Sequence, residues 1–190
     1  MAQDHPTVEF VDAEAWEAWL EENYATASGA WLRIAKRNAP HTTVRYPEVL
    51  DVALCFGWID IQRRPLDEHF FLQGFTRRTA RSKWSQVNRE KAERLIEQRR
   101  MRPGGLDAVT AAQADGRWEA AYPSQSRATV PADFERALDR NTPAKEFFST
   151  LTGQSRYAFL YRLHNVKTPE KRAQRIATYI ELLSARQTLT

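Results

Sequence analysis

Basic residues gather in the sequence "FTRRTARSKWS", directly before a segment that we expect to be helical. Arginine side chains and the N–H groups at the start of a helix both bind anions. The segment therefore predicts a pocket for a small anionic ligand, between this helix and the hairpin that precedes it. Tryptophans would pack against the ligand, arginines would supply charge, and an aspartate and an asparagine would orient polar groups. The predicted ligand-binding residues are Trp58, Asp60, Arg77, Arg78, Ser82, Trp84, Ser85 and Asn88.

The same residues also allow a purely structural interpretation. Residues 63–102 contain twelve Lys or Arg against five Asp or Glu, which is a net charge of +7. Part of this charge belongs to a helix surface, where Glu93 and Glu97 can pair with basic residues one turn away. In this interpretation Trp58 and Trp84 anchor the core, and the arginines only solvate a loop. The sequence leaves both interpretations open.

Two other functions can be built on these residues. An enzyme would use Asp60 as a general base in the same pocket, which requires a buried, roomy cleft. A nucleic-acid-binding protein would stack bases on tryptophan rings along the basic segment. The whole chain has a formal charge of only +4, and so mild an excess disfavours nucleic acid as the partner. The sequence therefore favours a binding protein over an enzyme, and it assigns no catalytic residue.

No metal or cofactor site is predicted. The four histidines, His5, His41, His69 and His164, are scattered along the chain without paired spacing, and Cys55 is the single cysteine. The sequence has no HExxH or CxxC motif and no glycine-rich phosphate loop. Cys55 lies in the apolar run "VALCFGW", where a buried cysteine without chemistry is the simplest interpretation.

The cellular compartment can also be predicted. A single cysteine cannot form an internal disulfide, so the cysteine count gives no sign of secretion. The N-terminal residues "MAQDHPTVEF" lack the basic and apolar regions of a signal peptide. No window approaches the ~18 apolar residues of a membrane span. We therefore expect a cytoplasmic protein without a membrane span.

Hydrophobic periodicity predicts an α+β fold, in which a small antiparallel sheet packed with helices is followed by a helical C-terminal region. In the first part, Asp12 caps a helix that ends near Tyr24, and "GAWLRIAKR" forms a strand. Another helix begins at Pro47 and ends at Gly57. The segments "WIDIQRR" and "EHFFLQGF" then form a hairpin.

Two further helices follow the hairpin. Ser82 or Ser85 caps the first of them, which runs to about Arg100 and is terminated by "RPGG". The second covers roughly residues 106–115 and ends at Gly116.

The polar, Pro-bounded stretch "YPSQSRATVP" predicts a linker. The predicted organisation is an α+β domain at residues 1–122, the linker at 123–131, and a helical domain at 132–190. In the helical domain, Asn141 or Thr142 begins one helix and Thr168 caps the last. Basic residues of this region could contact a protein partner, although an outward-facing helix surface explains them more simply. These residues are Lys167, Arg172 and Arg175.

Short motifs occur in a fixed order along the chain. They are "GWID" at 57–60, "FTRR" at 75–78, "SKWSQVN" at 82–88, "RM" at 100–101 and "DGRW" at 115–118. Together with the C-terminal "HNVKTPEKRAQRI", they resemble the YdeI/OmpD-associated family, often labelled bacteriocin-protection. The resemblance extends from about Trp31 to Ser184. The chain departs from the family pattern at Ile61, Arg77 and Lys171, where glycine, proline and threonine are common.

The resemblance implies a bacterial protein of the stress-resistance type. The family label refers to protection against antimicrobial peptides and to association with an outer-membrane protein, and the family has no agreed reaction. Combined with the residues above, this favours a non-enzymatic binding protein. If a ligand needed a small residue at position 61 for close approach, Ile61 would obstruct it.

Overall fold

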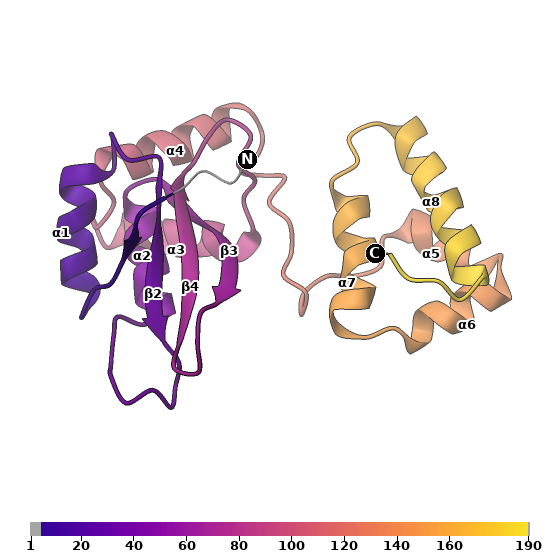
Figure 1. Cartoon of the computed structure of the whole chain (residues 1–190). Helices are drawn as coiled ribbons and strands as arrows, with labels where there is room; N and C mark the ends of the chain where they lie inside the picture. Colours follow the sequence, from indigo (N-terminus) through magenta and orange to yellow (C-terminus); the bar gives the residue numbers. More distant parts are fainter. Residues whose placement is uncertain (1–4, 190) are drawn as a thin grey trace. The chain divides into compact units, whose positions relative to one another are not determined.

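The structure of the chain is a computed structural model that describes residues 5–189. The described residues form eight helices and one four-stranded sheet, which confirms the predicted α+β fold (Figure 1). The chain divides into two compact units. The N-terminal unit comprises residues 5–84 with Asn88–Ala121, and the C-terminal unit comprises Ser85–Val87 with residues 122–189.

The N-terminal unit is a four-stranded sheet covered by helices. Its elements are β1 (Thr7–Val8), α1 (Ala13–Asn23), β2 (Gly29–Ala35), α2 (Tyr46–Cys55), β3 (Trp58–Pro65), β4 (Phe70–Arg77), α3 (Gln86–Glu97) from Asn88 onward, and α4 (Pro103–Ala114). The strand order is β1-β2-β4-β3, with β1 parallel to β2 and the other pairs antiparallel. Strand β1 is not predicted by the sequence, because two residues carry no periodicity. The helices lie on one side of the sheet (Figure 1).

The predicted hairpin is present as β3 and β4. In its turn, the Asp67 carboxylate accepts hydrogen bonds from the backbone N–H groups of His69 and Phe70, each at 2.8 Å. The strand pairing shifts register between Asp60 and Arg63, so the edge strand β3 contains a β-bulge. The bulge lies in the middle of β3, and the pairing resumes from Arg63 to the end of the strand.

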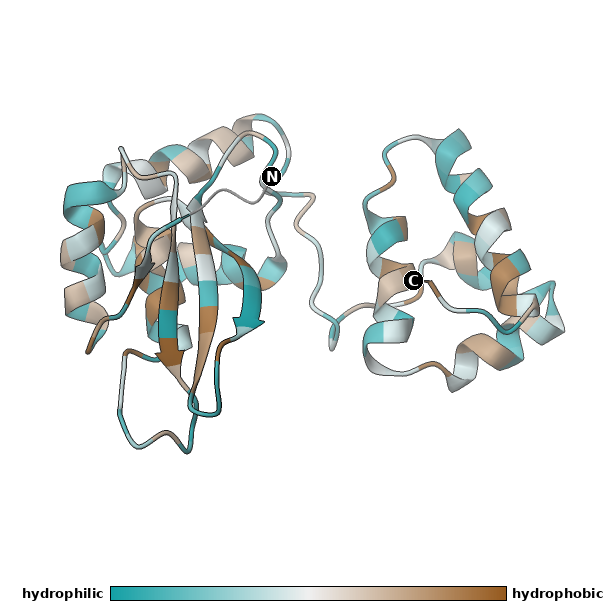
Figure 2. Cartoon of the chain, in the orientation of Figure 1, coloured by the Kyte–Doolittle hydropathy of each residue, from teal (hydrophilic) through white to brown (hydrophobic). Residues whose placement is uncertain are grey.

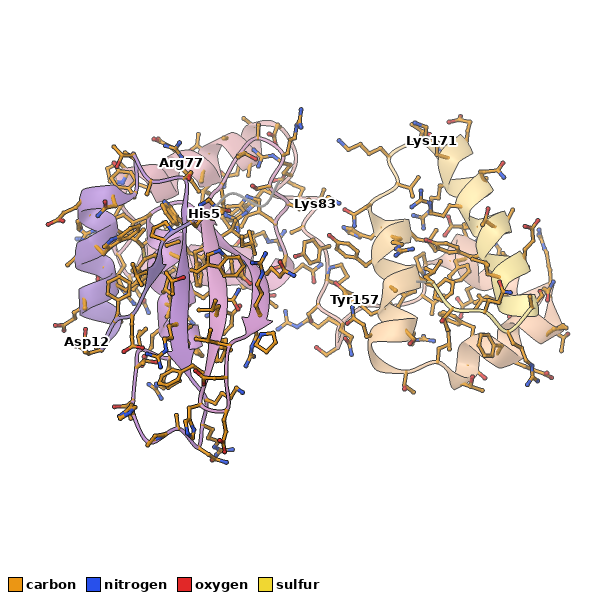
Figure 3. The ribbon with its side chains drawn as sticks, in the orientation of Figure 1. His5, Asp12, Arg77, Lys83, Tyr157 and Lys171 are labelled. Atoms are coloured by element: carbon orange, nitrogen blue, oxygen red, sulfur yellow. The ribbon has the colours of Figure 1, made fainter. Side chains whose placement is uncertain are left out.

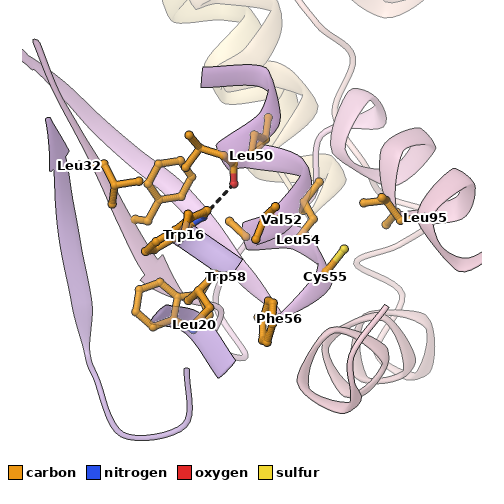
Figure 4. Close-up of a cluster of buried hydrophobic side chains, with 14 of the residues drawn as sticks. Trp16, Leu20, Leu32, Leu50, Val52, Leu54, Cys55, Phe56, Trp58 and Leu95 are labelled. Atoms are coloured by element: carbon orange, nitrogen blue, oxygen red, sulfur yellow. Dashed lines mark hydrogen bonds between the residues drawn. The ribbon is translucent and has the colours of Figure 1, made fainter. Parts of the chain in front are cut away.

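Aromatic and aliphatic side chains together fill the core between the sheet and its helices (Figure 4). Asp12 caps α1 as predicted, by accepting from the Ala15 N–H at 2.9 Å, and the helix then directs Trp16 inward. Trp16 is fully buried, and its indole N–H donates to the Val49 carbonyl at 3.2 Å. The Trp16 ring centroid lies 6.2 Å from that of Trp58, in an edge-on arrangement. Burial of such rings is a large favourable term in folding.

The opposite face of the sheet explains why arginines and aromatic residues alternate in the hairpin. The Arg64 guanidinium lies over the Trp31 ring at 4.2 Å, and the Arg33 guanidinium lies over the Phe70 ring at 3.5 Å. Trp31 and Phe70 are consequently only 7% and 4% exposed, although the helices of the N-terminal unit, in its described residues, lie on the other face. The flat cations shield the rings from water and are attracted to their π faces.

The segment "RPGG" does not terminate α3 in the way that the sequence predicts. Instead Pro103, Gly104 and Gly105 form the first turn of α4, where a proline is well suited to the first helical position. The glycines allow this turn to approach the end of α2 closely. A Cβ on Gly104 would lie 3.0 Å from the Phe56 carbonyl oxygen, and one on Gly105 would lie 2.2 Å from that of Cys55.

The C-terminal unit is helical, as predicted. It contains α5 (Ala132–Asp139), α6 (Thr142–Thr150), α7 (Gly153–His164) and α8 (Pro169–Ser184). Asn141 caps α6 and Thr168 caps α8, each through a side chain that accepts from a backbone N–H three residues later. Hydrophobic residues recur along α8 between hydrophilic ones (Figure 2). The buried core comprises Phe134, Leu138, Ala144, Phe148, Phe159, Leu160, Leu163, Ile176, Tyr179 and Leu183.

Arg172, one of the basic residues that could contact a protein partner, has a structural role within this unit. Its Nε and Nη2 donate to the two carboxylate oxygens of Asp133 at 2.5 and 2.9 Å, and its Nη1 donates to the Leu163 carbonyl at 2.8 Å. One side chain thus joins α8 to both α5 and α7. The hydrogen bonds from Arg172 hold the pKa of the Asp133 carboxyl below its ordinary value.

Replacing Arg172 with Met should therefore destabilise the C-terminal unit, because it removes three charge-assisted hydrogen bonds but keeps the apolar stem. We expect a loss of about 2 kcal/mol at pH 7, measured by urea denaturation followed by far-UV circular dichroism. The Asp133 pKa is lower in the folded state, so this stabilisation is present above the unfolded pKa and is lost as the pH falls through the folded value. The difference between Arg172→Met and the natural chain should shrink below about pH 4.

The matched control is Lys145→Met, which breaks the exposed ion pair of Lys145 with Asp139. This variant should unfold close to the natural chain. If the two variants lost the same stability, or if the Arg172→Met difference did not depend on pH, the proposed role of the Asp133–Arg172 pair would be wrong.

Candidate functional site

A cavity of about 420 Å³ opens in the N-terminal unit where β4 ends. Strand β4, the loop after it, the loop after α1, the α2–β3 turn and one side of α4 form its walls. The lining residues are Tyr24, Ala25, Phe56, Gly57, Arg77, Arg78, Thr79, Ala80, Gly104, Asp107, Ala108, Ala111, Asp115 and Arg117. The volume falls within the range of ~300–1,000 Å³ that is typical of small-molecule sites.

Both arginines predicted for the anion site, Arg77 and Arg78, line this cavity. Arg77, the last residue of β4, is exposed, and its Nη1 donates to the Ala25 carbonyl at 2.7 Å (Figure 3). The bond to Ala25 orients the Arg77 guanidinium and uses one of its five N–H groups. Arg78 lies deeper, because its guanidinium stacks on the Trp84 ring at 3.5 Å while Nη1 donates to the Lys83 carbonyl at 3.1 Å.

A third arginine, Arg117, comes from the "DGRW" motif and is absent from the predicted site. Its Nη1 donates to the Ser82 carbonyl at 3.0 Å, so it holds the loop that follows β4. Its Nε pairs with the Asp115 carboxylate at 2.7 Å. A resemblance to a family motif was the sole signal for this residue in the sequence, since forty residues separate it from Arg77.

Aromatic and glycine residues form another part of the cavity wall. The Tyr24 and Phe56 rings lie against each other with centroids 5.6 Å apart. Gly57 adopts a φ of +75°, and a Cβ on it would lie 2.3 Å from the Gly104 carbonyl oxygen. The turn after α2 and the first turn of α4 can therefore meet only because both positions are glycine. The cavity thus combines aromatic and glycine surfaces with charged side chains.

The two tryptophans predicted as ligand walls are core residues instead. Trp58 is fully buried, and its indole N–H donates to the Tyr24 carbonyl at 3.2 Å. Trp84 is 2% exposed, with its ring edge-on to Trp118 at 4.8 Å and its outer face covered by Arg78. Neither ring lines the cavity or is exposed for a base to stack on, so the nucleic-acid hypothesis loses its stacking platforms.

The other predicted site residues lie outside the cavity lining. Asp60 is half-buried on β3 and accepts a hydrogen bond from the Tyr46 hydroxyl at 3.0 Å, so the enzyme hypothesis loses a catalytic base in this pocket. Asn88 is 8% exposed on α3. The Ser82 hydroxyl does not cap α3 but accepts from the Thr79 N–H at 2.9 Å, which shapes the loop. Ser85 directly precedes α3 and forms a parallel β-bridge with Tyr122.

Ile61, one of the three departures from the family pattern, does not obstruct the cavity. Its side chain is 46% exposed on β3, and it lies beside Gly74 and Trp31, on the face of the sheet opposite the helices of the N-terminal unit. Cys55 is buried, and burial raises the pKa of its thiol to about 11. This pKa keeps the thiol protonated at neutral pH, which agrees with an inert core cysteine.

The C-terminal unit has a larger, shallower groove of about 690 Å³ between α5 and α8. Ala137 of α5 and Ala173, Ala177 and Ile180 of α8 form its apolar surface. Ala173 and Ala177 fit the apolar periodicity of α8, but both are exposed in this groove. Their small side chains leave the space between the two helices unfilled.

Two further features bear on function within residues 5–189. No group of three or more His, Cys, Asp or Glu side chains there is arranged to hold a metal ion. In the same residues, no helix is both long enough and apolar enough to pass through a bilayer.

Comparison with protein families finds matches to two regions of the chain. A family model described as a domain of unknown function, DUF8412, matches residues 8–108, which is more than half of the chain. The chain belongs to this family. A second model, described as bacteriocin-protection, YdeI or OmpD-associated, matches residues 127–186. Comparison with curated proteins and with solved structures finds no match.

The second family match confirms the predicted resemblance to the YdeI/OmpD-associated family for the C-terminal region. The C-terminal region is of the YdeI/OmpD-associated type. The motifs "GWID", "FTRR" and "SKWSQVN" instead lie in the region that the DUF8412 model matches. The cavity with Arg77 and Arg78 therefore belongs mainly to the DUF8412 region, and only Ala111, Asp115 and Arg117 of its lining lie beyond residue 108.

Proposed function

We propose that this DUF8412 protein binds a small anionic ligand, without turning it over, in the cavity beside β4. The observation that carries the proposal is the presence of Arg77, Arg78 and Arg117 around one cavity of about 420 Å³. Guanidinium groups bind carboxylates and phosphates through paired, charge-assisted hydrogen bonds. A cavity partly enclosed by Tyr24 and Phe56 strengthens such bonds, since it limits the access of water to them.

The arrangement of the three arginines supports binding by Arg77 in particular. Arg78 is engaged with Trp84 and Lys83, and Arg117 is engaged with Asp115 and Ser82. Arg77 keeps most of its N–H groups available, because the Ala25 carbonyl is its one hydrogen-bond partner among residues 5–189. A ligand would thus bind Arg77 directly, while the other two arginines add positive charge to the cavity.

A role in bacterial stress resistance forms part of the proposal. The description of the C-terminal match, which refers to bacteriocin protection, supports it. Under this proposal the N-terminal unit binds the ligand in the cytoplasm. Binding of a protein partner by the C-terminal helices stays a prediction, for which the groove between α5 and α8 offers a surface.

The proposal can be tested by thermal shift of the purified full chain. We expect inorganic phosphate or phenylacetate to raise the melting temperature at low salt, because a ligand that binds only the folded state stabilises it. Replacing Arg77 with Gln should weaken this binding by about tenfold or more, since it removes a charged hydrogen-bond donor.

Arg81→Gln is the matched control, because Arg81 is exposed on the same loop but does not line the cavity. It removes the same charge and should leave the thermal shift unchanged. Equal losses in Arg77→Gln and Arg81→Gln would indicate non-specific attraction of anions. No shift with any anion would contradict the proposed function.

A further inference from the structure

The charge around the cavity is not purely positive. Three arginines and two aspartates, Asp107 and Asp115, line it. The Asp115 carboxylate is held by the Arg117 guanidinium at 2.7 Å. Asp107 is exposed on α4 and forms no ion pair with any residue that the structure describes. One carboxylate in an anion-binding cavity is therefore left without a compensating positive charge.

Helix geometry places Asp107 inside the cavity wall. Gly104, Asp107, Ala108 and Ala111 recur at intervals of three and four residues, so they share one side of α4, and all of them line the cavity. Arg77 approaches from the end of β4, where the Ala25 carbonyl holds its guanidinium. Arg77 and Asp107 thus border the same cavity from different elements, without forming an ion pair with each other.

A bare anion would satisfy only part of this arrangement. It would gain from Arg77, but it would also be repelled by the Asp107 carboxylate in the same partly enclosed space. A ligand that carries a positive group beside its negative group would satisfy both side chains at once. Charge complementarity of this kind selects among ligands more than it raises overall affinity.

Resting on the proposed function, we infer that the ligand of this cavity is a small zwitterion. Its carboxylate or phosphate binds Arg77, its ammonium group binds Asp107, and its apolar body packs on the Tyr24 ring, which is partly exposed. Amino acids and phosphorylated amines share this chemistry. The cavity would accept either source, since guanidinium groups bind both carboxylate and phosphate.

The test is isothermal titration calorimetry of the full chain with probes that lack one charge at a time. L-phenylalanine carries both charges, N-acetyl-L-phenylalanine lacks the ammonium charge, and phenethylamine lacks the carboxylate. Phosphoethanolamine tests the phosphate source. We expect L-phenylalanine or phosphoethanolamine to bind, and loss of either charge to weaken binding by about tenfold.

Protein variants then assign each charge of the ligand to its residue. Asp107→Asn should abolish the preference for L-phenylalanine over its N-acetyl derivative, while Arg77→Gln should weaken the binding of both. Glu119→Gln is the control, because it removes an exposed carboxylate of the same unit that does not line the cavity. The preference for the zwitterion should survive in that variant.

The outcomes separate this inference from the function on which it rests. If simple anions bind in a manner that depends on Arg77, and N-acetylation makes no difference, the zwitterion inference is wrong and the anion-binding function stands. A preference that persists in Asp107→Asn would also overturn the inference. If no zwitterion and no anion binds, both the inference and the proposed function fail.

Discussion

Replacing Gly57 with Ala should destabilise the N-terminal unit by about 3 to 4 kcal/mol. Two effects combine at this position. The φ of +75° disfavours any residue with a Cβ, and that Cβ would lie 2.3 Å from the Gly104 carbonyl oxygen. The oxygen that this Cβ would meet belongs to the backbone, so no side-chain rotation can relieve the clash. Urea denaturation followed by tryptophan emission measures the loss, because all six tryptophans lie in this unit.

Gly116→Ala separates the two effects. Gly116 has nearly the same φ, +77°, but a Cβ added there would have no atom within 4 Å. This variant should lose only about 1 to 2 kcal/mol, the cost of the left-handed backbone alone. Equal losses at both glycines would show that the close approach of the α2–β3 turn to α4 does not limit stability.

Trp58→Ala should have the second large effect, a loss of about 3 to 5 kcal/mol in the free energy of unfolding. Trp58 is fully buried, and its ring lies edge-on to both Trp16 and Trp19, at centroid distances of 6.2 and 6.0 Å. Truncation to alanine removes these contacts and leaves a cavity in the core. The same urea denaturation measures the effect.

Trp58→Phe is the milder companion variant. It keeps an aromatic ring in the core and removes the indole N–H that donates to the Tyr24 carbonyl. We expect a loss of about 1 to 2 kcal/mol. If Trp58→Ala remained as stable as the natural chain but lost anion binding, Trp58 would be a ligand wall, as the sequence first predicts, and its placement in the core would be wrong.

Local signals in the sequence predict much of the fold correctly. Asp12, Asn141 and Thr168 cap their helices as expected, since a capping bond involves residues only three positions apart. Strand β2 shows the predicted alternation, with Leu32 and Ile34 buried in the core and Arg33 on the opposite face. These features depend on nearest neighbours in the chain, which a sequence displays directly.

Features that depend on tertiary contact are less predictable. "RPGG" is typical of a helix end, but its glycines are needed where α4 meets the carbonyl groups of Cys55 and Phe56. Tryptophan is a residue type that often lines ligand sites. Only the packing of α1 and α4 around Trp58 and Trp84 shows that these two residues belong to the core. Among the cavity charges, Arg77 and Arg78 are predictable from their clustering. Asp107 and Arg117 lie at the cavity because of how the chain folds, and no local sequence pattern predicts this position.

The bulge in β3 has a consequence for the behaviour of the protein in concentrated solution. A sheet with two open edges can recruit strands from other copies and grow into aggregates. Here one edge, β1, spans only Thr7–Val8, too short to template a partner. The other edge is interrupted between Asp60 and Arg63, and Pro65 ends it without an N–H to offer. Neither margin of the sheet provides a long, regular row of hydrogen-bonding groups, so the folded protein should resist association through its strands in concentrated solution.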